Sequence, residues 1–325
     1  MSFRDVIGHS KQLEQLTRML RNRKIAHSYL FAGLEGIGKR CVAKEFAKAL
    51  NCQEKSEDAC DNCISCKKIE KGTFLDVHVL KPDGNQIKVD QVRNLQREFL
   101  YALHEGYYRV IIIDDAQKLN IQASNAFLKI LEEPPVSTVI ILISDSVYSL
   151  LPTVISRCQI VKFNSLGHED VVKILVEKLG IDRERAMNVA VFSMGSAKRA
   201  LTMSEDVSIM NFQKNLSRLV TLKLNDLDTI ISKAEELSRC GESLKEKLNI
   251  LKMFYRDVSL KKQGIEHTKG YNKDYVKEIE GFSETLPLPD ILERIFKVES
   301  AQRDLEGNVN KQILVENLLI RLAVS

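Results

Sequence analysis

The segment that most limits the fold of this chain lies near its start, where an apolar run, a glycine-rich turn and a helical pattern follow one another. Residues 29–32 are apolar, residues 33–40 read GLEGIGKR, and residues 41–50 have helical spacing. Glycines let the backbone of such a turn point successive N–H groups inward, and a lysine at the helix start adds positive charge. The sequence therefore predicts a phosphate-binding loop formed by Gly33, Gly36, Gly38 and Lys39.

One position of this loop departs from the pattern that binds a nucleotide with magnesium. Position 40 is expected to be Ser or Thr, whose hydroxyl ligates magnesium, but it is Arg40, which cannot coordinate a cation. Candidate carboxylate ligands for magnesium, Asp114 and Asp115, directly follow the apolar run 110–113. Two interpretations stay open: a structural turn whose anion site is empty or filled by the Arg40 guanidinium, or a loop that still binds ATP. In either case we expect weak magnesium binding and no efficient ATP hydrolysis by this chain alone.

Four of the seven cysteines lie close together, directly after the helix of the phosphate loop. They are Cys52, Cys60, Cys63 and Cys66, and the last three form two overlapping C-x-x-C units. Thiolates at this spacing can converge on one ion, and four sulfur ligands close a tetrahedron without an open position. We predict structural zinc, with free thiols or an iron–sulfur cluster as alternatives. The separate Cys41, Cys158 and Cys240 are expected to be inert core thiols.

Apolar runs alternate with helical patterns over the first half of the chain. The runs cover residues 28–32, 77–80, 110–113, 138–143 and 159–163. This alternation is typical of a parallel α/β sheet. Beyond residue 166 the β-rich runs end: glycines at 167, 180 and 195 separate short helical stretches, and longer leucine-rich stretches begin near residue 208. We predict an α/β domain at 1–165 with a zinc module at about 51–67, a small helical lid at 166–207 and an all-helical domain at 208–325.

The composition of the chain indicates where the protein is located but does not identify a binding partner. Lys and Arg number 48 against 44 Asp and Glu, and a net charge of +4 is too small to predict a nucleic-acid-binding surface by itself. No apolar run approaches the roughly 20 residues of a membrane helix, and the first residues lack the apolar core of a secretion signal. We expect a cytoplasmic protein without a membrane partner.

Several local motifs together resemble the clamp-loader branch of AAA+ proteins. They are residues 7–9 (IGH), the cysteine insert after the phosphate-loop helix, residues 125–135 (NAFLKILEEPP) and residues 156–158 (SRC). The resemblance implies a P-loop AAA+ domain, a helical lid and an all-α collar through which subunits form a ring. It assigns Arg157 as an arginine finger that reaches the ATP of a neighbouring subunit, and Lys198 as a lid residue that contacts phosphate. Hydrolysing AAA+ proteins generally carry Glu where this chain has Asp115, and Asp145 would repel phosphate, so both departures agree with Arg40.

The resemblance also implies a role in DNA replication, within the replisome at the bacterial nucleoid and as part of a DNA-directed DNA polymerase holoenzyme. The implied partners are gamma or tau ATPase subunits and a delta subunit in a hetero-pentameric ring, with the sliding clamp and primed DNA reached through the complex. The alternative inside the family is the ATP-hydrolysing gamma or tau subunit, and Arg40 and Asp115 argue against it. A nucleic-acid-binding zinc module is more distant, because the chain has no tryptophan and no basic run interleaved with aromatic residues.

Overall fold

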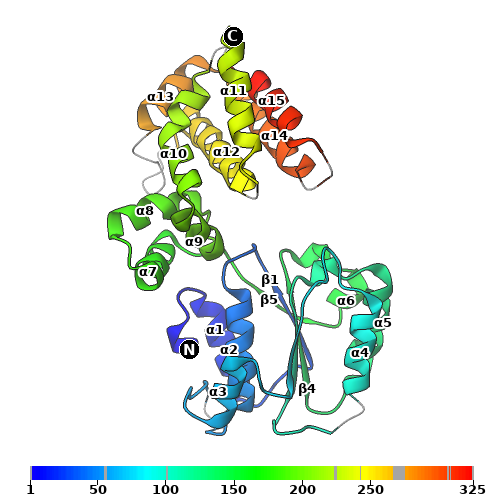
Figure 1. Cartoon of the computed structure of the whole chain (residues 1–325). Coiled ribbons are helices and arrows are strands. Elements are labelled where there is room, and N and C mark those ends of the chain that lie inside the picture. The colour runs from blue at the N-terminus through cyan, green and yellow to red at the C-terminus, as the bar shows by residue number, and fades with distance from the viewer. Residues whose placement is uncertain are drawn as a thin grey trace. The chain divides into compact units, whose positions relative to one another are not determined.

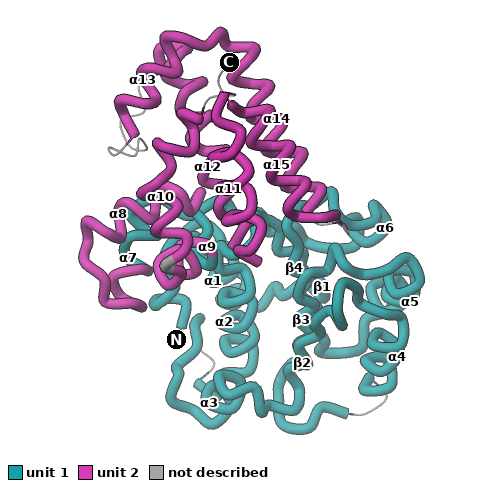
Figure 2. The backbone as a smooth tube through the Cα atoms, turned by 45° about the horizontal axis from the view of Figure 1, so that its top comes forward, with its two compact units in different colours: residues 1–174, 195–198 teal, residues 175–194, 199–325 magenta. Residues whose placement is uncertain are grey.

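The computed structural model describes residues 2–54, 57–99, 102–222, 225–241, 243–265, 275–305, 307 and 309–323. The chain divides into two compact units, which Figure 2 shows in separate colours: residues 1–174 with 195–198, and residues 175–194 with 199–325. The domain boundaries predicted after residues 165 and 207 remain predictions. Among the described residues, no helix is both long and apolar enough to span a bilayer.

Five strands form one parallel sheet in the first unit, in the order β2-β3-β4-β1-β5. Their bounds are β1 Ser28–Ala32, β2 Val77–Leu80, β3 Arg109–Ile113, β4 Thr138–Ser144 and β5 Gln159–Lys162. Every residue of β1, β3 and β4 is buried, whereas β2 and β5 at the sheet edges are partly exposed. Aromatic and β-branched residues dominate the central strands, as expected for strands covered on both faces. The parallel α/β sheet predicted from the apolar runs is confirmed.

Helices cover both faces of this sheet (Figure 1). Their bounds are η1 Phe3–Asp5, α1 Ser10–Arg21, α2 Lys39–Asn51, α3 Ile64–Lys71, α4 Val89–Glu98, η2 Ala116–Lys118, α5 Ile121–Glu132, η3 Val147–Ser149 and α6 Pro152–Ile155. On one face, Leu30 of β1 and Ile140 of β4 belong to the same apolar cluster as Phe127 of α5. On the other face, the ring of Tyr29 lies 5.3 Å from the ring of Phe46 in α2. Because successive side chains of a strand point to opposite faces, β1 joins both helical layers to the sheet.

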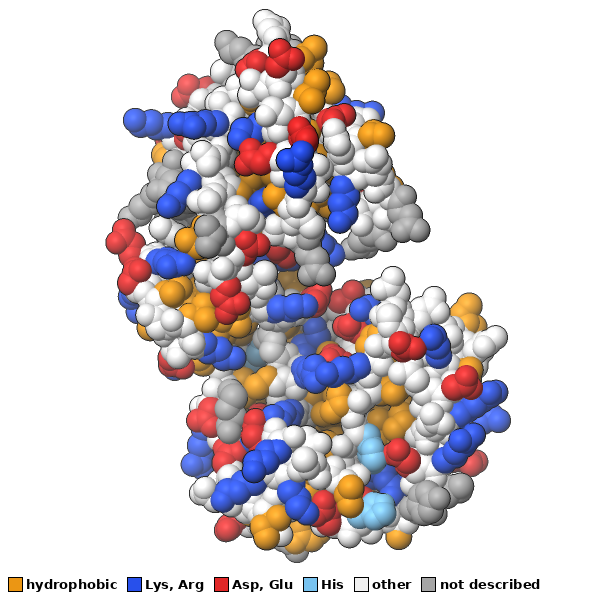
Figure 3. Space-filling view, viewed as in Figure 1, with side chains coloured by type: hydrophobic (Ala, Val, Ile, Leu, Met, Phe, Trp, Pro, Cys, Tyr) orange, Lys and Arg blue, Asp and Glu red, His pale blue; other side chains and the backbone are white. Residues whose placement is uncertain are grey.

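All the remaining elements of the described chain are helices, which confirms the all-helical character predicted beyond residue 166. Their bounds are α7 His168–Leu179, α8 Arg183–Phe192, α9 Ala197–Glu205, α10 Val207–Val220, α11 Leu227–Ser238, α12 Ser243–Lys262, α13 Val276–Thr285, α14 Leu288–Asp304 and α15 Lys311–Leu322. Figure 3 shows acidic and basic side chains interspersed over one face of each unit, in keeping with the small net charge of +4.

The helix α12 is the centre of the second unit and packs against α10, α13 and α14. Tyr255 of α12 is fully buried, and its ring lies 6.4 Å from that of Phe282 in α13. Arg294 of α14 is also buried and donates hydrogen bonds to the Tyr255 hydroxyl at 3.3 Å and to the carbonyl oxygen of Leu322 in α15. A buried guanidinium at the last turn of a helix satisfies a carbonyl that no helical N–H can reach. These contacts join α12, α14 and α15 into one core.

Candidate functional sites

The phosphate loop connects β1 with α2 and follows a path that requires its glycines. Gly33, Gly36 and Gly38 have φ angles of 159°, 78° and 102°. A Cβ at Gly33 would lie 2.3 Å from the carbonyl oxygen of Phe163, and a Cβ at Gly36 would lie 2.5 Å from the Oγ of Ser196. At Gly33 and Gly36 glycine is needed both for the backbone conformation and because the chain packs closely around the loop, whereas at Gly38 only the φ angle favours it.

Lys39, at the start of α2, turns back onto the carbonyl groups of its own loop. Its Nζ donates hydrogen bonds to the carbonyl oxygen of Gly33 and, at 2.6 Å, to that of Leu34, and the residue is only 6% exposed. The pKa of Lys39 is lowered from its ordinary value because the side chain is buried. The nearby carboxylates of Asp145 and Asp115 oppose this effect but do not cancel it. The ammonium group that the motif assigns to a phosphate is thus hydrogen-bonded within the loop.

Arg40, the next residue, forms an ion pair with the first carboxylate after β3. Its Nη1 lies 3.2 Å from the Oδ2 of Asp114. The following residue, Asp115, has a φ angle of 52° and pairs with Lys118 at 3.0 Å. The carboxylates that hold magnesium and orient water in P-loop ATPases occur at this strand end. In this chain both of them contact cationic side chains of the same molecule.

Lys198 of α9 lies beside the phosphate loop. Its backbone N–H donates to the carbonyl oxygen of Gly36 at 3.0 Å, and its Nζ lies 2.7 Å from the Oε1 of Glu35. The Oγ of Ser196 donates to the carbonyl oxygen of Glu35 at 3.0 Å. The hydrogen bond with Glu35 raises the pKa of Lys198. Like Lys39, the predicted lid cation is paired with a group of the loop.

The four cysteines of the predicted zinc module converge on one point, since their Sγ atoms all lie within 4.8 Å of one another. The N–H of Cys66 points at the Sγ of Cys63 at 3.4 Å, and the N–H of Cys63 points at the Sγ of Cys60 at 3.3 Å. Burial raises the pKa of Cys63, but hydrogen bonds with the backbone of Cys66 and Gln53 outweigh it and lower the pKa to about 7. Four thiols with donors that stabilise thiolate fit a closed tetrahedral Zn²⁺ site and provide no ligand position for water.

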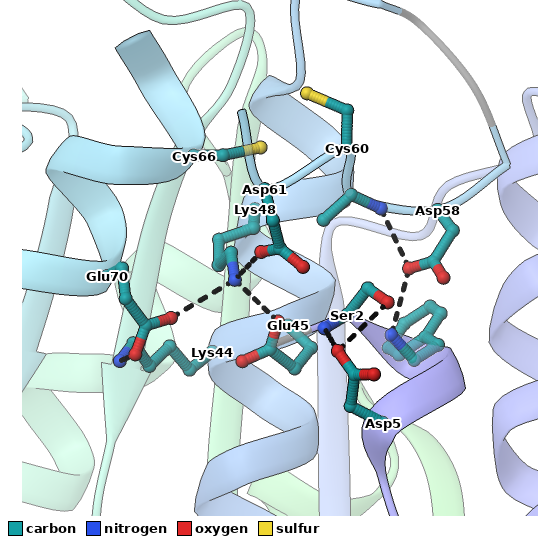
Figure 4. Close-up of polar contacts among 12 residues, drawn as sticks. Ser2, Asp5, Lys44, Glu45, Lys48, Asp58, Cys60, Asp61, Cys66 and Glu70 are labelled. Atoms are coloured by element: carbon teal, nitrogen blue, oxygen red, sulfur yellow. Dashed lines mark hydrogen bonds and ion pairs between the residues drawn. The ribbon is translucent and has the colours of Figure 1, made fainter. Parts of the chain in front are cut away.

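A buried lysine, which the sequence analysis missed, ties the cysteine module to α2 (Figure 4). Lys48 is fully buried, and its Nζ contacts Glu45 at 2.9 Å, Glu70 at 3.1 Å and Asp61. Asp61 lies inside the cysteine loop and has a φ angle of 60°. Burial alone would lower the pKa of Lys48, but its three carboxylate partners raise it. The spacing of Glu45 and Lys48 on one helix was a local signal for part of this cluster, whereas Asp61 and Glu70 come from other segments and have none.

Arg157 lies at the opposite end of the sheet from the phosphate loop. It precedes β5, and its backbone carbonyl accepts a hydrogen bond of 2.5 Å from the Oγ of Ser28, the first residue of β1. Its guanidinium lies 2.7 Å from the carboxylate of Glu132. The phosphate loop begins only after the last residue of β1, and a strand of this length spans roughly 15 Å, which exceeds the reach of an arginine side chain. Arg157 therefore cannot serve the phosphate loop of its own chain.

A groove of about 620 Å³ lies along α14 and α15 in the second unit. Phe296, Ile313 and Val309 line it and remain 64%, 61% and 47% exposed. On α15, Leu318 and Leu322 are buried in the core, whereas Ile313 faces outward into the groove. Grouped exposed apolar side chains of this kind mark surfaces that contact other proteins.

The strand order, a phosphate loop between β1 and α2, two carboxylates after β3 and an all-helical second part define a P-loop protein of the AAA+ class. Residues 8–167 match the family model described as DNA polymerase III, delta subunit, and residues 213–323 match the one described as DNA polymerase III, delta subunit, C terminal. The chain belongs to the family of DNA polymerase III clamp-loader subunits.

Its relatives include more than one kind of subunit from this family. The chain is 29% identical to DNA polymerase III subunit delta-prime of Bacillus subtilis, over 95% of this chain and 94% of that protein. It is 30% identical to subunit tau of the same organism, over 97% of this chain but 56% of that protein. Among solved structures, a gamma subunit-related protein of Thermotoga maritima has 20% identity and a TM-score of 0.44, covering 95% of this chain and 97% of that one. Identities of 29% and 30% do not separate a delta-prime type from a tau type.

Proposed function

We propose that the chain is the delta-prime subunit of a bacterial DNA polymerase III clamp loader and does not hydrolyse ATP itself. In a hetero-pentameric ring with gamma or tau ATPase subunits and a delta subunit, it helps to load the sliding clamp onto primed DNA during replication. The group that it contributes to hydrolysis is Arg157, directed at the ATP of a neighbouring subunit. This role places the protein in the cytoplasm, at the replisome.

The observation that carries the proposal is the ion pair between Arg40 and Asp114. In P-loop ATPases, a hydroxyl at the first of these positions and a carboxylate at the second hold magnesium against the triphosphate. Here a guanidinium replaces the hydroxyl and also contacts the carboxylate. Without a bound magnesium ion, the site lacks the charge that stabilises a phosphoryl group during transfer. The loop then serves as a structural turn, with Lys39 bonded to its carbonyl groups.

The position of Arg157 supports action on another subunit. It lies beside the first residue of β1, whereas the phosphate loop follows the last. A guanidinium is planar, permanently charged and forked, so that it matches the geometry of a phosphate group. Placed at the γ-phosphate of a neighbour, such an arginine offsets developing charge and accelerates hydrolysis by about 10³ to 10⁵-fold.

The cysteine module has a structural part in this proposal. A zinc ion bound by Cys52, Cys60, Cys63 and Cys66 would supply a fixed crosslink between the end of α2 and the start of α3. Cys52 directly follows α2, Cys60 and Cys63 lie in the loop before α3, and Cys66 lies in α3, so the ion would hold the insert against the domain. No chemistry is assigned to it, because four thiolates fill its coordination sphere.

The groove along α14 and α15 supports ring assembly through the second unit. Phe296 and Ile313 would each lose most of their exposed apolar surface if a neighbouring subunit covered them. Burial of apolar area is the main favourable contribution to most subunit contacts. We therefore assign this surface to the collar contact of the proposed ring.

The test is the loading of a labelled clamp onto primed DNA by a reconstituted ring. Rings are assembled from the cognate ATPase and delta subunits with the wild-type chain or with Arg157→Ala, and ring formation is measured by analytical ultracentrifugation. We expect the variant to join the ring and to reduce the loading rate by at least about 100-fold, because a finger contributes about 10³-fold or more to hydrolysis. Unchanged loading by rings that contain Arg157→Ala would overturn the proposal.

The ATP-hydrolysing gamma or tau subunit is the alternative, and the 30% identity with tau over 97% of the chain favours it. This alternative requires that the chain bind and hydrolyse Mg-ATP by itself. Titration of the purified chain with labelled ATP at physiological magnesium, followed by a turnover assay, separates the two functions. Hydrolysis that disappears with Lys39→Ala would support the alternative and contradict a delta-prime role.

A further inference from the structure

The backbone of Arg157 is fixed to the centre of the first unit. Its carbonyl oxygen accepts the hydrogen bond from Ser28, which is 1% exposed, and its N–H donates to the carbonyl oxygen of Val154 at 3.2 Å. Val154 belongs to α6 and is also buried. The point from which the arginine side chain extends is therefore set by the core.

Contacts from two separate helices hold the side chain of Arg157, in addition to a longer one of 3.5 Å from its Nη1 to the Oγ of Ser156. The Nη1 of Arg157 donates to the carbonyl oxygen of Thr153 in α6 at 3.0 Å, and its Nη2 donates to the Oε1 of Glu132, the last residue of α5, at 2.7 Å. The arginine side chain is 36% exposed and that of Glu132 is 50% exposed, so another molecule can reach the pair. A guanidinium has five N–H donors, which leaves donors for a phosphate while these contacts persist.

An exposed ion pair of this kind contributes little to the stability of a fold. Its effect is to restrict a side chain that otherwise samples many rotamers. Much of that freedom is lost when an arginine binds a phosphate, and a side chain that is already held loses less. A group kept in the reactive geometry before the reaction therefore accelerates the chemical step more than a mobile one.

We propose that Glu132 is a positioning residue for the arginine finger: its carboxylate on Nη2, with the Thr153 carbonyl on Nη1, keeps the Arg157 guanidinium in the place from which it meets the triphosphate of the neighbouring subunit. This inference rests on the proposed function of Arg157. Glu132 is the first of the two glutamates in the 125–135 motif. The function proposed above gives no role to this residue, and the inference adds one: it sets the geometry of the finger.

The experiment measures kcat and KM for ATP in rings that contain the wild-type chain, Glu132→Ala, Glu132→Gln or Arg157→Ala. The matched control is Glu133→Gln, since Glu133 is the next residue, is exposed, and has no side-chain hydrogen bond or ion pair with any described residue. We expect Glu132→Ala to lower kcat about tenfold with KM and ring assembly unchanged, because the neighbour still binds ATP with its own loop. Glu132→Gln keeps an acceptor oxygen and is expected to recover most of that loss, and Glu133→Gln is expected to match the wild type.

The outcomes distinguish the positioning role of Glu132 from the proposed finger role of Arg157. If Arg157→Ala lowers kcat strongly while Glu132→Ala matches Glu133→Gln, the positioning role is wrong and the finger remains. A rise in kcat with Glu132→Ala would also overturn the inference, because it would show that the carboxylate restrains the arginine. If Arg157→Ala has no effect, the proposed function itself fails. Should Glu132→Ala weaken ring assembly, Glu132→Gln decides the question, and a loss of assembly in both variants would assign Glu132 to structure alone.

Discussion

Helix α2 carries a site at each of its ends, and the two sites use their polar groups in opposite ways. At its first turn, Lys39 bonds to carbonyl groups of the loop and Arg40 pairs with Asp114. Beyond its last turn, Cys52 joins three other thiols whose sulfur atoms lie within 4.8 Å of one another. The binding groups of the first site are satisfied by the chain itself, whereas those of the second converge on one point. The presence of a motif therefore does not by itself determine what a site binds. The groups that its side chains already contact determine this.

The largest effect is expected from removing one thiol of the cysteine cluster proposed to bind zinc. In Cys63→Ser we expect loss of the zinc ion and a decrease of at least about 3 kcal/mol in the free energy of unfolding, since structural zinc contributes directly to folding. Metal content by atomic emission and urea denaturation measure the two effects. The control is Cys41→Ser on α2, outside the cluster, for which zinc content should stay at one ion per chain. Equal stability of Cys63→Ser and Cys41→Ser would show that the cysteine module contributes nothing to the fold.

The next largest effect is expected at Lys48, the buried lysine that contacts the cysteine module. Lys48→Met leaves the carboxylate of Glu45, which is 1% exposed, without its cation, and breaking one side of a buried ion pair costs about 3 kcal/mol or more. We expect urea denaturation to show a loss of this size. Lys44→Met is the matched control one turn earlier on α2: its pair with Glu70 is partly exposed and is expected to contribute less than about 1 kcal/mol. Similar losses in the two variants would contradict the special role of Lys48.

A smaller effect is expected at the start of α2, where substitution of Arg40 tests whether this residue prevents the phosphate loop from binding Mg-ATP. Arg40→Thr restores the hydroxyl and releases Asp114 from its ion pair, so we expect Mg-ATP binding to tighten by about tenfold, which corresponds to roughly 1.4 kcal/mol. Isothermal titration with and without magnesium measures this change. Arg40→Ala releases Asp114 without supplying a hydroxyl and is expected to give less. If both variants bind Mg-ATP as weakly as the wild type, the hydrogen bonds of Lys39 to its loop, and not Arg40, limit the affinity.

Much of this arrangement could be predicted from the sequence, and the physical reason is local. Apolar β-branched runs bounded by turns identified the five strands. Overlapping C-x-x-C spacing, together with the nearby Cys52, identified four thiols that meet in space. Pro134 and Pro135 are a local signal for the end of α5, which stops at Glu132. Each of these signals lies within a few residues of the feature that it predicts.

The contacts that distinguish the two ends of α2 could not be predicted in this way. The pair of Arg40 with Asp114 joins residues on different elements, and the bonds of Lys39 to its own loop depend on how deeply its side chain is buried. Glu132 reaches Arg157 across 25 positions of sequence. Such pairs depend on three-dimensional packing, for which a single sequence carries no spacing rule.

The smallest predicted effect is a pH dependence at the phosphate loop. His9 donates from Nε2 to the carbonyl oxygen of Ile37 at 2.7 Å, and burial lowers its pKa despite opposing contributions from this bond and from Asp170. The unfolded chain, with a pKa of about 6.5, then binds the proton more readily than the native chain. The stability contributed by His9 is therefore present above about pH 6.5 and is lost as the pH falls toward the lower native pKa. Between pH 7.5 and 5.5, the free energy of unfolding from urea denaturation should fall by up to about 1 kcal/mol more for the wild type than for His9→Gln. An equal decrease in the two proteins would contradict this prediction.

The most direct test of the account is the rate of ATP hydrolysis by cognate ATPase subunits in rings that contain Arg157→Ala or Lys39→Ala. If Arg157 acts on the ATP of a neighbour, Arg157→Ala should lower the rate about 10³-fold, whereas Lys39→Ala should leave it close to that of the wild type. The reverse pattern, with hydrolysis dependent on Lys39 and indifferent to Arg157, would show that this chain turns over its own ATP and does not assist a neighbour.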